Sequence, residues 1–108
     1  MKQIVRSICL ALLLLVIPMS AHAAPQKVSY TGGDGSSFEK AVVIHGANEL
    51  TGVDAEYDYL AQHYRGYHRG KQSLSSHGKR HFDVLEFTTT GGKKMTIHFD
   101  ITEFFGKY

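Results

Sequence analysis

The sequence has a single cysteine, Cys9, which lies close to the N-terminus. One cysteine cannot form an intramolecular disulfide, and it cannot build a zinc site from several thiolates. Small exported domains often rely on disulfides, because a short chain buries only about 60–65% of its unfolded surface. A domain of this length without such cross-links therefore needs a well-packed core or a partner.

The sequence also lacks an apolar run long enough to span a membrane. Its longest run, residues 8–17, has ten residues, whereas a membrane-spanning helix needs about 20. Lys2 and Arg6 precede this run and give it a positively charged start. Ala21 and Ala23 are the small residues that signal peptidase recognises before the cleavage site. We therefore expect a cleavable signal peptide over residues 1–23, no membrane anchor after cleavage, and export, with the periplasm as the expected destination and the cell exterior as the alternative.

Beyond this leader, the sequence has no excess of charge of either sign. Lys2 and Arg6 are two of the 12 basic residues, so residues 24–108 hold ten basic residues against ten acidic ones. With neutral histidines, the net charge of this part is zero. A basic, nucleic-acid-binding protein is therefore not indicated, and we expect no nucleic-acid partner.

Composition divides the chain into three parts. Residues 1–23 form the expected signal peptide, and residues 24–37 are polar and rich in glycine, which predicts a flexible segment. Residues 38–108 alternate apolar and polar stretches without internal repeats. This last part is predicted to be a single globular α+β domain.

The apolar pattern of that domain predicts one helix and several strands. Residues 51–54 resemble a capping box, and Gly66 is a natural stop. Between them, apolar residues recur at helical spacing: Val53, Tyr57, Leu60, Ala61 and Tyr64. Strands are expected over residues 41–44, 71–75, 81–89 and 94–101, followed by a short C-terminal helical turn over 101–106. The predicted order is β-α-β-β-β, with about four strands in a small antiparallel sheet and the helix packed on it.

The glycine pair at residues 91–92 sets the expected register of the last hairpin. A two-residue loop would place apolar residues opposite polar ones. A three-residue loop pairs Phe87 with Met95 and Leu85 with Ile97, so that all four share one face. We therefore predict a loop of odd length with a bulge, in which a glycine takes the left-handed position. Along residues 94–101 we expect alternate side chains to point inward and outward: Met95, Ile97, Phe99 and Ile101 inward, and Lys94, Thr96, His98 and Asp100 outward.

Two strings carry a resemblance to other proteins. GGDGSSFEKA at residues 32–41 and FDITEFFGK at residues 99–107, with the Asp-Val pair at residues 83–84 between them, resemble segments of a group of small exported bacterial proteins of unknown function. The resemblance spans nearly all of the chain after the leader. It implies a compact exported α+β domain, and it implies no activity and no functional residue.

Charge is sorted along the middle of the chain. Residues 49–58 hold four acids and no base, whereas residues 59–82 hold five bases and four histidines and no acid. Arginine pairs with phosphate or carboxylate, and tyrosine stacks on sugar rings or on other proteins. We interpret this stretch as the surface of a binding or interaction module without a cofactor, for an unknown protein or an anionic envelope glycan; a purely solvated surface is the alternative. The candidate binding residues are Tyr64, Arg65, Tyr67, His68, Arg69, Lys79 and Arg80.

The histidines suggest a second class of function, a periplasmic transition-metal-binding protein. Imidazole is a common ligand of zinc, copper and nickel. The candidate ligands are His63, His68, His77 and His81. Their spacing matches no known ligand signature, and no neighbouring carboxylate completes a set.

No catalytic motif is present, and we predict that the protein is not an enzyme. The serines at residues 73–76 lie near His77, His81 and Asp83 in the sequence, but a catalytic triad is recognised by its geometry. Asp83 and Asp100 are expected on neighbouring strands, where two carboxylates could meet. A domain of this size offers little room for the deep cleft that such a pair would need.

Overall fold

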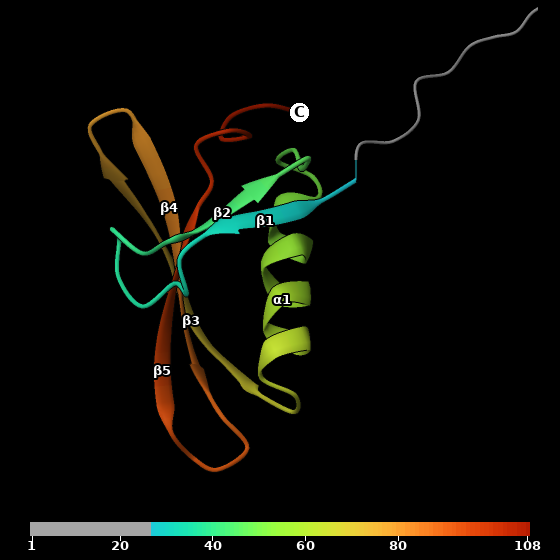
Figure 1. Cartoon of the computed structure of the whole chain (residues 1–108), viewed down its shortest axis with the longest axis vertical. Helices are drawn as coiled ribbons and strands as arrows, with labels where there is room; N and C mark the ends of the chain where they lie inside the picture. Colours follow the sequence, from blue (N-terminus) through green and yellow to red (C-terminus); the bar gives the residue numbers. More distant parts are fainter. Residues whose placement is uncertain (1–26) are drawn as a thin grey trace, which may run out of the picture.

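A computed structural model describes residues 27–108, and the expected signal peptide lies outside these residues. The described part is a small α+β domain with one helix and a five-stranded sheet (Figure 1). The predicted class is therefore confirmed. Among residues 27–108 no helix is long and apolar enough to cross a membrane. The elements are β1 (Ser29–Gly32), β2 (Val42–His45), α1 (Gly52–His63), β3 (His68–His77), β4 (Arg80–Thr88) and β5 (Lys94–Asp100).

The sheet is mixed, with the strand order β1-β2-β5-β4-β3. All neighbours are antiparallel except β2 and β5, which run parallel and pair Val42 with Phe99 and Val43 with Asp100. The prediction of an antiparallel sheet was wrong at this joint. An N-terminal hairpin, β1–β2, is here attached to the edge of a C-terminal three-stranded meander.

The prediction of four strands was wrong by one, because β1 lies within the segment expected to be flexible. Its sequence is polar and has no apolar alternation, so the sequence pattern does not identify it. The strand instead forms by pairing with β2, in the register Ser29 to His45 through Gly32 to Val42. The hydroxyl of Tyr30 also donates to the Ala55 carbonyl of α1, at 2.7 Å.

The register predicted for the last hairpin is confirmed. Phe87 pairs with Met95 and Leu85 with Ile97. The Thr89 amide donates to the Lys93 carbonyl at 2.9 Å, which closes the odd-length loop. Gly92 has φ of 86°, the left-handed conformation that a bulged turn requires of one residue.

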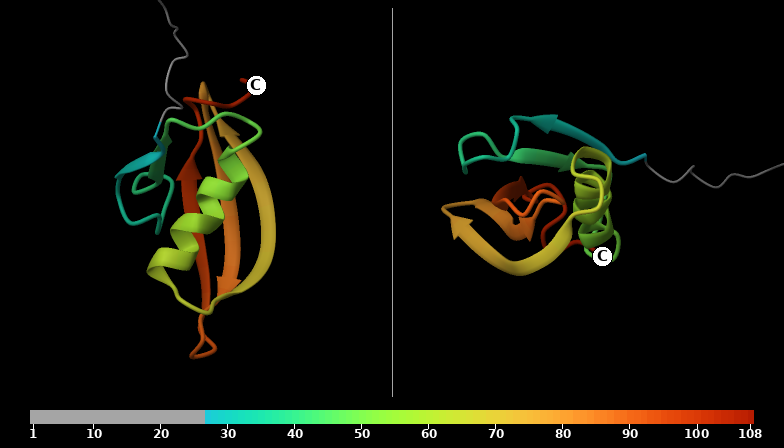
Figure 2. Two further views of the ribbon diagram at one scale, coloured as in Figure 1. Left: turned by 90° about the vertical axis from the view of Figure 1, so that its right-hand side faces the viewer. Right: turned by 90° about the horizontal axis from the view of Figure 1, so that it is seen from below.

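One face of the sheet carries α1, and the helix and the curled sheet enclose the core (Figure 2). Phe99 is fully buried at the centre and meets the Tyr59 ring edge-on, with centroids 5.5 Å apart. The buried helix residues are Gly52, Ala55, Glu56 and Leu60. Val53 and Ala61, which the apolar pattern assigns to the core, are exposed. The buried face is thus rotated from the predicted one, because small residues let the helix approach closely and Glu56 occupies a core position.

The other face of the sheet is covered in one place by Phe38, from the loop between β1 and β2. Its ring lies 4.2 Å from that of His77, 4.5 Å from that of His98 and 5.0 Å from that of Phe82. His98 and Asp100 were predicted to point into solvent, but His98 is half-buried and Asp100 is buried. The alternation of β5 is as predicted; the loop covers its second face.

The start of α1 and the C-terminal residues also differ from the prediction. Thr51 makes no side-chain capping bond, and its hydroxyl instead accepts from the Asn48 amide at 3.0 Å. At the C-terminus, the residues after β5 form hydrogen-bonded turns, and α1 is the single helix of the described part. Phe104 is buried there, and Phe105 stacks on the His81 ring with centroids 3.9 Å apart.

Replacing Gly52 with alanine tests the packing of the helix start. A Cβ at Gly52 would overlap the buried Phe104 ring. Overpacking costs about 1–3 kcal/mol, whereas alanine in a helix gains about 1 kcal/mol over glycine. We expect Gly52→Ala to lower the midpoint of thermal unfolding, and Phe104→Leu in the same protein to recover part of the loss. A higher midpoint for Gly52→Ala alone would contradict this packing.

Candidate functional site

The predicted binding surface maps onto β3 and the corner that β3 makes with α1. β3 is the last strand of the sheet order, and its outer edge pairs with no other strand of the described part. Nine of its ten residues are exposed and the tenth is half-buried. Figure 2 shows the strand curving along one side of the molecule, with α1 beside its beginning. β3 is therefore an exposed edge strand of the sheet.

The two tyrosines of the predicted site support the core as well as lining the corner. Tyr64 and Tyr67 are half-buried, and their rings lie 4.8 and 6.1 Å from the Phe87 ring. They connect the end of α1 to the start of β3. The interpretation of these rings as covers of the core edge therefore holds for part of each side chain.

Arg69, a cation of the predicted set, lies over an aromatic ring. Its guanidinium carbon lies 3.7 Å from the centre of the Tyr57 ring, which stacks parallel to Tyr67 at 6.4 Å. The Tyr57 hydroxyl donates to Gln72 of β3 at 3.3 Å, so the platform is tied to both α1 and β3. A guanidinium over a ring face is attracted by the ring, and its N–H groups can still donate to a planar anion.

The charge of Arg69 is not balanced by an ion pair. Residues 27–108 contain two salt bridges, His45 with Glu103 and Arg80 with Asp100. Arg69 takes part in neither, and Lys71, the next cation of β3, does not either. Both side chains are exposed.

Arg80, by contrast, is committed to the fold. Its Nε and Nη2 donate to Asp100 Oδ2 at 3.2 and 2.7 Å. Burial acts to raise the pKa of Asp100, but hydrogen bonds from Thr102 and Arg80 outweigh it, and the pKa lies below its usual value. Arg80 therefore contributes less to an anion-binding surface than its sequence position indicates. Its neighbour Lys79 is exposed in the turn between β3 and β4. Arg65 and His68, which are close to Arg69 in the sequence, are exposed as well.

The histidines proposed as metal ligands lie apart and have separate contacts. His63 stacks on Tyr59 at 3.9 Å, His77 contacts Ser75 and Phe38, and His81 contacts Ser76 and Phe105. His68 is at the start of β3. Within residues 27–108 no group of three or more His, Cys, Asp or Glu side chains is placed to hold a metal ion. This geometry gives no support to the metal alternative.

A serine and a histidine do meet on the β3–β4 hairpin. Ser76 Oγ lies 2.8 Å from His81 Nδ1. In the described part no carboxylate is hydrogen-bonded to this imidazole, so the third member of a triad is not supplied. Asp83 and Asp100, expected to approach each other, lie on opposite faces of the sheet, since Asp83 pairs with Phe99 and Asp100 with Phe82.

Asp83 faces a different acid, Glu56 of α1, which is not among the predicted site residues. Glu56 is fully buried, and neither of its carboxyl oxygens has a hydrogen-bond partner of good geometry among the described residues. Burial is the largest cause that raises the pKa of Glu56, and interaction with Asp83 is the next; together they raise it to about 10. Glu56 is therefore a neutral acid at neutral pH. Its helical spacing from Gly52 and Leu60 was the only sequence signal for its burial.

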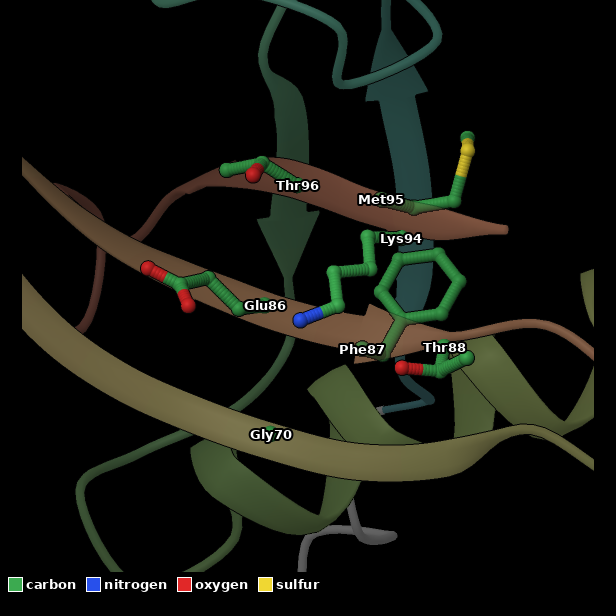
Figure 3. A pocket seen from close by; sticks show the side chains of 7 residues that line it. All are labelled: Gly70, Glu86, Phe87, Thr88, Lys94, Met95 and Thr96. Carbon is green, nitrogen blue, oxygen red and sulfur yellow. The ribbon is translucent and has the colours of Figure 1, made fainter. Parts of the chain in front are cut away.

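A shallow hollow of about 210 Å³ lies where β3 approaches the end of the β4–β5 hairpin. Figure 3 shows Lys94 reaching from β5 across β4, with Glu86 beside it. A side chain at Gly70 would meet the Glu86 carbonyl, at 2.6 Å from its Cβ, so glycine is required where β3 crosses. One acid and one base line this hollow, which therefore has no preference for either sign of charge. The lining residues are Gly70, Glu86, Phe87, Thr88, Lys94, Met95 and Thr96.

Comparison with known proteins finds no matching family model, no similar curated protein and no similar solved structure.

Glu56→Gln tests the neutral buried acid. With a pKa of about 10 when folded and an ordinary value of 4.5 when unfolded, the folded protein holds one more proton between these pH values. The free energy of unfolding should therefore fall as pH rises through this window, by about 1.4 kcal/mol per unit for one proton. Glutamine carries no titratable proton, so Glu56→Gln should flatten the dependence measured by urea unfolding from pH 5 to pH 9.

The matched control is Glu86→Gln, which alters an exposed carboxyl on β4. This variant should keep the pH dependence of the parent protein. Equal slopes for the parent and Glu56→Gln would show that Glu56 does not hold the extra proton.

Proposed function

We propose that this domain is an exported binding module that recognises an anionic ligand through β3 and the β3–α1 corner. The observation that carries the proposal is the guanidinium of Arg69, held 3.7 Å over the Tyr57 ring with no carboxylate partner in residues 27–108. An exposed arginine in a fixed orientation loses less conformational freedom when it binds a carboxylate or phosphate than a mobile one does.

The charges around Arg69 favour the same class of ligand. No acidic residue occurs between Tyr59 and Phe82, whereas Arg65 and Lys71 flank Arg69 in the sequence and are exposed. The acids of residues 49–58 lie on the preceding helix region, and one of them, Glu56, is kept neutral by burial. An approaching anion therefore meets cations along β3 without a compensating acid on that strand.

Export is part of the proposal and is supported by the sequence of residues 1–23 alone. Beyond the inner membrane, the chemically suitable ligands are acidic segments of envelope proteins and anionic glycans. Both present carboxylates, which the planar fork of arginine binds with two parallel hydrogen bonds.

The anion-binding proposal can be tested with two simple probes, polyglutamate and a polyuronate. The purified domain should bind at least one of them at low ionic strength, and added salt should weaken the binding. Arg69→Ala should raise Kd about tenfold, because about 1.4 kcal/mol of charge-assisted hydrogen bonding is lost. Arg69→Lys should recover only part of the affinity, since lysine has no planar fork.

Lys40→Ala is the matched control, because it removes an exposed cation from the loop between β1 and β2, at the opposite edge of the sheet from β3. Its Kd should stay close to that of the parent protein. An Arg69→Ala variant that binds both probes as tightly as the parent would overturn the proposal.

A further inference from the structure

We propose that the ligand is an extended acidic segment of a partner protein, which pairs with the outer edge of β3 as a sixth strand of the sheet. This inference rests on the proposed anion-binding function and names its ligand class. It is carried by the backbone of β3 and by the exposed apolar side chain of Leu74, which a glycan would leave unused.

The edge of β3 is long enough and accessible enough to template a strand. A bulge between Arg69 and Gln72 interrupts the pairing with β4, and from Gln72 to His77 the register is regular. These six residues span about 20 Å at about 3.4 Å each. In a strand paired on one side only, alternate N–H and C=O groups point outward without partners. The opposite edge of the sheet, β1, has only four residues.

One large apolar side chain of this strand is exposed. Leu74 of β3 is 56% exposed, although it pairs with Asp83 and lies on the face of the sheet that carries α1. The helix contacts β3 nearer its beginning, where Tyr57 meets Arg69 and Gln72. Leu74 therefore lies beyond the part of the strand that the helix covers, where an added strand could contact it.

These features define the segment that fits. An added strand would place an apolar side chain beside Leu74, and acidic side chains toward Lys71 and Arg69. Strand addition takes affinity from the main chain and specificity from alternate side chains. The expected partner segment is therefore extended and alternates acidic and apolar residues.

A second copy of this chain fits the edge poorly. β3 carries Arg69 and Lys71 and no acidic residue, so a pair of β3 strands would bring the cations of both copies together without a compensating acid. Like charges directly opposed across strands are destabilising. The bulge and Lys71 are also features with which natural sheets discourage pairing between copies.

The experiment uses a synthetic peptide in which glutamate alternates with valine, together with the same peptide methylated on alternate backbone amides. Methylation keeps every side chain and charge but removes the hydrogen bonds of one strand edge. Two methylated forms are used, which carry the modification on opposite edges of the peptide. We expect one form, methylated on the edge that faces β3, to bind at least tenfold more weakly than the parent peptide, and the other form to bind within twofold of it. Amide hydrogen exchange of alternate residues within 72–77 should slow at least tenfold in the complex.

Paired variants test the side-chain part of the inference. Lys71→Glu should weaken binding of the parent peptide at least tenfold, whereas Lys40→Glu, the same charge change in the loop between β1 and β2, should alter Kd less than twofold. Leu74→Ser should weaken binding about fivefold through the loss of apolar contact.

The outcomes separate this inference from the anion-binding proposal. Equal binding of all peptide forms, with unchanged exchange in residues 72–77 and a loss on Arg69→Ala, would overturn strand addition and leave anion binding intact. Binding of the polyuronate but not of the peptide would do the same and assign a glycan. A dimer in sedimentation, with the same amides protected in the absence of peptide, would assign a second copy and also overturn the inference.

Discussion

The fold depends on the short parallel joint between β2 and β5. Only two residue pairs form it, Val42 with Phe99 and Val43 with Asp100, yet it attaches the N-terminal hairpin to the meander. Because α1 follows β2 directly in the chain, the joint also determines where the helix begins relative to the sheet. Phe99 is the residue on which these elements meet: Val42 pairs with it from β2, Asp83 from β4, and the Tyr59 ring covers it from α1.

The length of the helix then determines what the sheet leaves open. α1 has 12 residues and is about 18 Å long, whereas β3 has ten residues and extends over about 34 Å. A helix of this length cannot cover such a strand from end to end. Tyr57 contacts β3 near its beginning, at Arg69 and Gln72, and Leu74 further along is exposed. The exposure of this face of β3 around Leu74 is therefore a consequence of the mismatch between one short helix and one long strand.

The sequence predicts what local periodicity controls and misses what distant contacts control. The register of the last hairpin could be predicted, because burying four apolar residues on one face allows only an odd-length loop. β1 could not, since Ser29–Gly32 is polar and becomes a strand only through its pairing with β2. For the site, the basic, tyrosine-rich stretch identified Arg69 but not its platform: Tyr57 follows the helical pattern of the core, and only the fold brings the two together. The same helical pattern does not predict that Glu56 is buried, because no local feature of the sequence marks an acidic residue as a core residue.

The buried acid nevertheless bears on the proposed binding surface. With the pKa of Glu56 raised to about 10, the carboxyl is uncharged at neutral pH, so residues 24–108 carry ten basic residues against nine ionised acidic ones. The missing negative charge lies under α1, next to Asp83, which pairs with Leu74 in the middle of the proposed strand edge. An ionised Glu56 would repel an acidic ligand from beneath that edge, through protein of lower dielectric than water. Burial thus removes an unfavourable charge from the side of the molecule where β3 presents its cations. The desolvation that keeps Glu56 uncharged therefore favours the binding of an anionic partner at this surface.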